Sequence, residues 1–133
     1  GGLLCNEAVY PKIINAHRAN GAKIEVVLGS QSTLNGTIAI SILTSYSILR
    51  AIESGLPIVK SSDMSGTAFI DVNGNVLQQI PNEKEGTLVG DIYLASDELN
   101  IFSKYPEWFN IFSWTVLVIT LLYIFYRRFV HRV

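Results

Sequence analysis

The chain contains little of what several common protein classes require. Its 133 residues include one cysteine, Cys5, so an intramolecular disulfide framework is excluded and the thiol is free. The formal net charge is -1, which does not support the basic surface of a nucleic-acid-binding protein. No glycine-rich phosphate loop is present, and His17 and His131 have no partner at metal-ligand spacing. The sequence therefore predicts no metal and no cofactor, and His17 is expected to be a structural or surface residue.

One long apolar segment lies near the C-terminus. Residues 108–126 contain no charge and approach the roughly 20 residues that cross a hydrocarbon core. Aromatic side chains stand towards both ends of the segment, and Arg127 and Arg128 follow it. Because a soluble core helix normally has a polar face, we expect a transmembrane helix at 108–126. The positive-inside rule then puts the basic tail, 127–133, in the cytoplasm and the globular part on the other side, the periplasm in a Gram-negative cell.

The rest of the chain alternates between strand and helix patterns. Helical periodicity predicts helices at 10–20 and 37–54, the second with a stripe at Ile38, Ile42, Ser45 and Leu49. Strands are expected at 2–5, 23–28, 58–61, 67–72, 76–80 and 87–94. Asn73-Gly74 joins two of these strands and is a strong hairpin signal. This order predicts an α/β domain over 1–96 with a late antiparallel portion, followed by a polar linker at 97–107.

Cys5 stands where the first expected strand ends and a helix follows. A thiol at that point is held at the edge of the sheet, facing whatever enters the cleft. A lone cysteine is more often a small core residue, but Glu7, two positions later, is an unusual neighbour for one. Together with the apolar segment, this arrangement indicates cysteine chemistry next to a membrane. The chain begins without Met and within a strand pattern, so we expect a fragment of a longer protein.

The segment around Cys5 resembles the nucleophile turn of the nitrilase, or carbon-nitrogen hydrolase, superfamily. In that turn a cysteine follows a buried strand, an acidic residue stands two positions on, and a proline follows soon after, as Cys5, Glu7 and Pro11 do here. Further segments resemble later parts of the same domain, in the same order: 20–23, 49–57, 61–67 and 70–77. The fold implied by this resemblance is the C-terminal half of an α-β-β-α sandwich.

The C-terminal part of the chain is similar to that of a membrane-embedded branch of the superfamily, the apolipoprotein N-acyltransferases. There an aromatic stretch precedes one last transmembrane helix with a basic tail. Residues 102–108 and the span after them resemble that arrangement. The Cys-x-Glu spacing also suits this branch. The resemblance implies a multi-pass protein of the bacterial inner membrane whose periplasmic domain is followed by the final helix.

The same resemblance implies an acyl transfer in two steps. Cys5 would attack a phospholipid acyl donor, and the thioester would pass its acyl chain to the N-terminal amine of a diacylglyceryl-modified lipoprotein. Glu7 would support Cys5 by shaping the cleft, whereas Arg50 and Glu53 are expected to form a structural ion pair. The superfamily's base Glu and its Lys lie upstream of the cysteine, so we expect this fragment to be inactive alone.

Two other functions remain open at the level of the sequence. The family's Asn-Asp-x-Trp-Phe-Gly loop is replaced here by residues 29–36, and the helix after it lacks the usual His. A membrane-tethered amidohydrolase of the nitrilase type would use water as the second nucleophile. An inactive nitrilase-like membrane protein would have lost the chemistry altogether.

Overall fold

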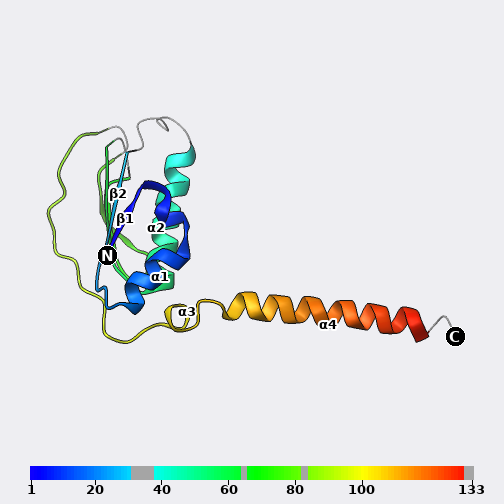
Figure 1. Ribbon diagram of the computed structural model, residues 1–133. Coiled ribbons are helices and arrows are strands. Elements are labelled where there is room, and N and C mark those ends of the chain that lie inside the picture. The colour runs from blue at the N-terminus through cyan, green and yellow to red at the C-terminus, as the bar shows by residue number, and fades with distance from the viewer. Residues whose placement is uncertain (31–37, 64–65, 82–83, 131–133) are drawn as a thin grey trace.

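The computed structural model describes residues 1–30, 38–63, 66–81 and 84–130 (Figure 1). Along the chain these residues form β1 (Gly2–Leu4), the 3-10 helix η1 (Cys5–Val9), α1 (Pro11–Ala19), β2 (Glu25–Gly29), α2 (Ile38–Ser54), β3 (Ile58–Ser62), β4 (Ala68–Ile70), β5 (Val76–Gln79), α3 (Ile101–Lys104) and α4 (Trp108–Val130). The α/β fold with one C-terminal apolar helix is confirmed.

A five-stranded sheet with the order β1-β2-β3-β4-β5 forms the centre of the domain. The first three strands are parallel and the last two pair antiparallel, as expected for the late part of the chain. The turn between β4 and β5 has Gly74 at φ 83°, and the Gly74 N–H donates to Asp71 O at 3.0 Å. The hairpin predicted at Asn73-Gly74 is therefore confirmed, with both strands shorter than expected.

Helices α1 and α2 cover one face of this sheet (Figure 1). The sheet contributes buried residues from each of four strands, and Ile14 and Ala51 meet them from the two helices. The sheet residues in this core are Leu3, Val27, Ile58, Ala68 and Ile70. The described residues thus supply one sheet and one helical layer, which together are half of a sandwich.

The stripe that predicted helix α2 is not its buried side. Ile38, Ile42 and Leu49 are exposed, whereas the side chains turned to the interior are Ile40, Ser47, Arg50, Ala51 and Ser54. The predicted helix itself is confirmed over Ile38–Ser54. Small residues occupy most of the inner side, where the helix meets the domain interior, and the larger side chains point outward.

Residues 87–94 do not form the predicted strand. They have no regular structure, and Val89 and Tyr93 are 85% and 89% exposed. Alternating polarity indicates that one side of a segment can be covered, but a strand also needs a neighbouring backbone with which to pair. In the described part of the chain 87–94 finds none, and it runs outside the sheet until the Ala95 N–H donates to Lys23 O at 3.0 Å.

The segment predicted as a polar linker is packed against the domain. The Asn100 side chain caps α3 by accepting from the Ser103 N–H at 2.8 Å, and it donates to Ile52 O at 3.0 Å. The Ser103 hydroxyl donates to Ser54 O at 3.0 Å. These bonds satisfy carbonyls that the end of α2 would otherwise leave without partners. The chain therefore reaches α4 through an ordered connection.

Helix α4 extends through the predicted span and beyond it. Residues Trp108–Arg128 are long and apolar enough to cross a membrane, and none of this window is buried inside the protein. The alternative of a buried core helix therefore does not hold for the described chain. So large an exposed apolar surface requires a lipid or protein environment.

Candidate active site

The carboxyl ends of the three parallel strands meet at one edge of the sheet. Cys5 directly follows β1, Gly29 ends β2, and Asp63 directly follows β3. Ser30 donates its hydroxyl to Asp63 Oδ2 at 2.6 Å, which links the segments that leave β2 and β3. Ligands of open α/β sheets bind outside the carboxyl ends of the strands. This edge is therefore the candidate site.

Cys5 is exposed and held in an uncommon backbone conformation. Its φ of 50° is the only positive value among the non-glycine residues that the structure describes. Such a conformation costs roughly 1–3 kcal/mol and is found mainly where surrounding structure enforces it, often at active sites. A sharp, strained turn from strand to helix also presents the nucleophile in α/β-hydrolases. The common role of a lone cysteine, filling the core, does not apply to an exposed thiol.

Glu7 closes the turn that carries Cys5. Its Oε2 accepts a hydrogen bond from the Leu4 N–H at 2.7 Å, so the carboxylate joins the residues on both sides of the cysteine. The Cys5 Sγ is 3.8 Å from the Asn6 side-chain oxygen, so the thiol's described partner is Asn6. This geometry fits the supporting role predicted for Glu7, which remains a prediction.

Arg50 fixes η1 from the side of α2. Its guanidinium pairs with Glu53 Oε2 at 2.9 Å, which confirms the predicted ion pair. It also donates to Val9 O at 3.3 Å, and only 5% of Arg50 is exposed. The link to Val9 joins residues far apart in sequence, so local spacing gave no signal for it. Arg50 is therefore part of the scaffold that holds the Cys5 turn.

Lys60 is a buried cation that the sequence analysis missed. It lies on β3, two residues before the end of that strand at Ser62, in register with Val27 and, through Val27, with Leu3. Only 3% of Lys60 is exposed, and its ammonium donates to Thr44 Oγ1 at 3.0 Å. Burial lowers the pKa of Lys60 from 10.5 to about 8. The sequence did carry a signal for this burial. Side chains alternate between the two faces of a strand, so Lys60 lies on the same face as the apolar Ile58.

Lys60→Met is expected to change how stability depends on pH. The folded protein releases the Lys60 proton near pH 8, whereas the unfolded chain keeps it to about 10.5. Between these values the unfolded state binds more protons, so the contribution of Lys60 to the free energy of unfolding rises with pH. Lys60→Met should therefore be more stable than the wild type below pH 8, by at most about 3 kcal/mol, and this advantage should shrink towards 10.5.

Thermal unfolding of the full-length protein in detergent, from about pH 7 to 10.5, measures this difference. Lys84→Met serves as the matched control because Lys84 is exposed. Its difference from the wild type should not vary with pH. Parallel curves for wild type and Lys60→Met would contradict the prediction.

The remaining predicted features lie away from Cys5 or outside the described residues. His17 Nδ1 is 3.0 Å from Oε1 of Glu25, a carboxylate that is 0% exposed, so the histidine is structural. Most of the altered loop at 29–36 lies outside the described residues, and so does His131.

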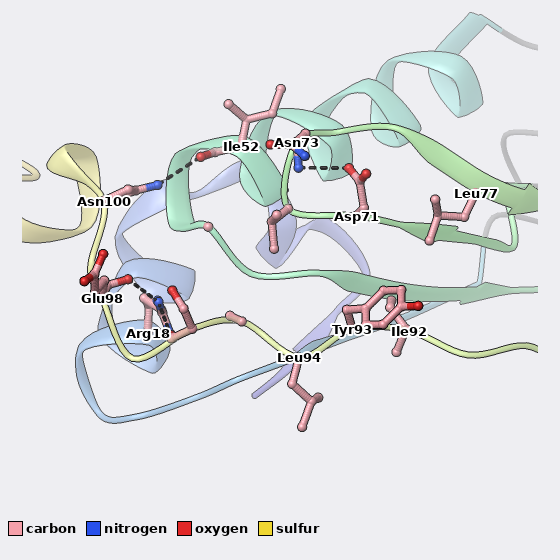
Figure 2. A pocket seen from close by; sticks show the side chains of 14 residues that line it. Arg18, Ile52, Asp71, Asn73, Leu77, Ile92, Tyr93, Leu94, Glu98 and Asn100 are labelled. Atoms are coloured by element: carbon pink, nitrogen blue, oxygen red, sulfur yellow. Dashed lines mark hydrogen bonds between the residues drawn. The ribbon is translucent and has the colours of Figure 1, made fainter.

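A cavity of about 660 Å³ lies at the other end of the sheet (Figure 2). The β4–β5 turn, with Asp71 and Asn73, forms one side, and the chain from Ile92 to Asn100 forms the other. Arg18 donates to Ser96 O at 2.8 Å and to Glu98 O at 2.7 Å, which fastens the second side. Cys5 does not line this cavity. The cavity therefore lies apart from the Cys5 thiol, and the candidate site remains at the carboxyl edge of the sheet.

The sheet and the turn that carries Cys5 define an α/β protein with a cysteine presented at the carboxyl edge of its first parallel strand. Comparison with known families agrees with this class. The carbon-nitrogen hydrolase family matches residues 1–98, and the chain belongs to this family.

Several relatives match most of the chain. An apolipoprotein N-acyltransferase 1 of Treponema denticola is 28% identical over 133 residues, 99% of this chain and 24% of the relative. Apolipoprotein N-acyltransferases of Geobacter metallireducens and Bdellovibrio bacteriovorus are 25% and 29% identical over 86% and 91% of the chain, and 21% and 22% of their own length. The chain thus spans about a quarter of the length of these relatives, and the resemblance seen in the sequence is confirmed.

Proposed function

We propose that the whole protein is an N-acyltransferase that moves a fatty acyl chain from a phospholipid, through a thioester on Cys5, to the N-terminal amine of an apolipoprotein. The observation that carries the proposal is the exposed Cys5 in its strained turn, in a chain that continues into an apolar helix. The relatives named apolipoprotein N-acyltransferase support the same reaction.

The reaction divides into two acyl transfers. The Cys5 thiolate attacks the acyl carbonyl carbon, the ester C–O bond breaks, and the lysophospholipid alkoxide leaves as an alcohol after taking a proton. The acceptor amine then attacks the thioester carbon, the C–S bond breaks, and the amine loses a proton as the amide forms. Each step is easier than a direct transfer from ester to amine, because a thioester is activated towards amines.

Within this mechanism the described residues position the nucleophile. Glu7 and Arg50 hold the turn from its two sides, through the Leu4 N–H and Val9 O. A base for the thiol and a cation or N–H donors for the oxyanion are also required. By the superfamily resemblance a Glu and a Lys fill these roles in the preceding part of the protein, so residues 1–133 should be inactive alone.

We infer a bacterial inner-membrane location for the whole protein. Helix α4 would cross the membrane with the site on the periplasmic side, because Arg127 and Arg128 follow the span and favour the cytoplasm. The donor would then come from the surrounding bilayer, and the acceptor would be a diacylglyceryl-modified lipoprotein anchored in the same membrane.

Mass spectrometry on the full-length protein purified from membranes tests the thioester. We expect the peptide that contains Cys5 to carry a fatty-acyl adduct that neutral hydroxylamine removes and that Cys5→Ala lacks. A Cys5 that stays unmodified after incubation with phospholipid would reject the proposal. Release of ammonia from small amides by the same preparation would then favour the amidohydrolase, and no reaction with either substrate would favour an inactive relative.

A further inference from the structure

A second concave surface lies beside α1. It is a groove of about 400 Å³ between α1 and the residues that lead into α4, called the α1–α4 groove below. Lys12, Asn15 and Ala16 line it from α1, and Ser103, Glu107 and Asn110 line it from the other side. Its volume falls in the range of about 300–1,000 Å³ that is typical of small-ligand sites. Cys5 is not one of its lining residues.

The groove lies at the depth where α4 would enter the membrane. Glu107 directly precedes the span, and Trp108 begins it. Trp108 lies 6.3 Å from Phe102 and 5.9 Å from Phe109 between ring centroids, and the Lys104 ammonium lies 5.6 Å from the Tyr105 ring centroid. Aromatic rings grouped with a cation at the end of an apolar helix are typical of the headgroup layer. The groove is therefore placed among lipid headgroups.

The polar groups of the groove carry both signs of charge. Lys12 contributes an ammonium from α1, and Glu107 contributes a carboxylate from the opposite side. Neither forms an ion pair with another described residue, although Glu107 Oε2 accepts from Asn110 Nδ2 at 2.9 Å. Asn15 adds little to this polar surface, because it is 9% exposed and its Oδ1 is buried.

We propose that the α1–α4 groove binds the headgroup of a phospholipid that carries a primary ammonium, as phosphatidylethanolamine does. The lipid phosphate would pair with Lys12, and the ammonium would pair with Glu107. A headgroup with a phosphate and no cation would leave Glu107 unpaired beside an anion, which selects against it. This site is separate from the acyl-transfer site; it rests on the inferred membrane crossing of α4 and not on the acyl transfer.

Lipid retention by the full-length protein tests the site. The protein carries Cys5→Ala to prevent turnover and is extracted from vesicles of equal parts phosphatidylethanolamine and phosphatidylglycerol, and bound lipids are counted by native mass spectrometry. We expect the Lys12→Gln, Glu107→Gln double variant to retain roughly tenfold less phosphatidylethanolamine at this one site. Lys104→Gln is the matched control, since Lys104 is an exposed cation near the start of the same span but does not line the groove.

Equal retention by the double variant and its parent would overturn the proposal, and so would an equal loss in Lys104→Gln. Equal retention of both lipids by the parent would reject the role of the ammonium. A photoreactive benzoylphenylalanine in place of Ala16, which is exposed in the groove, gives an independent readout. Cross-links to ethanolamine lipid support the site, whereas cross-links only to protein would mean that another segment covers it and would overturn the proposal.

Discussion

Cys5→Ala in the full-length protein is expected to lower acyl transfer by at least about 1,000-fold, because no neighbouring group can replace a lost nucleophile. The measurement is the transfer of a labelled acyl chain from phospholipid to a diacylglyceryl-modified peptide in detergent micelles. The Cys5 thiol is exposed at the edge of the sheet, so its loss leaves no cavity in the core. The variant should therefore fold normally and fail in both half-reactions.

Cys5→Gly separates the chemistry from the fold. Glycine adopts φ values near the 50° of Cys5 without steric cost, so this variant should be at least as stable as the wild type and equally inactive. Lys84→Ala, which changes an exposed residue, should keep full activity. If Cys5→Ala or Cys5→Gly retained more than about a tenth of the transfer rate, Cys5 would not be the nucleophile.

The sequence was most informative where local chemistry decides the structure. Pro11 opens α1, Gly55 at φ 65° follows the end of α2, and Gly74 shapes the hairpin, and each acts through its own backbone. The position of Cys5 after a short apolar strand is of the same kind. Together with the apolar patterns, these signals predicted the five observed strands, helices α1 and α2, and the place of the thiol at the end of the first strand.

The errors arose where distant partners decide the structure. Residues 87–94 have the alternation of a strand, but pairing depends on another backbone, which their own sequence cannot reveal. The packing of the connection before α4 depends on Asn100 and Ser103, which bond to the end of α2 about 50 positions earlier. Likewise, the link from Arg50 to Val9 spans 41 positions. In the candidate site, therefore, the position of Cys5 at the end of the first strand was predictable, and the contacts that hold its turn were only partly so.

Glu7→Ala is expected to slow acyl transfer by about 100-fold, since small displacements of a reacting group can cost that much. The reason is the hydrogen bond from the Leu4 N–H to Glu7 Oε2 at 2.7 Å, which closes the turn around Cys5. Glu7→Gln keeps an oxygen that can accept the same bond, in a weaker, uncharged form, and should lose only about 10-fold. Steady-state kinetics should show the loss in kcat, with KM nearly unchanged, if Glu7 positions the thiol and does not bind the lipid.

The glutamine variant distinguishes positioning from proton transfer. A general base at position 7 would make Glu7→Gln as inactive as Glu7→Ala, and it would remove the limb of the pH–rate profile that the carboxylate controls. A positioning residue leaves that profile unchanged and is partly rescued by the isosteric amide. Asp91→Ala removes another exposed carboxylate from the described chain and should have no effect on the rate. Equal losses in Glu7→Gln and Glu7→Ala would therefore assign Glu7 to the chemistry itself, because the bond to the Leu4 N–H needs only an acceptor oxygen.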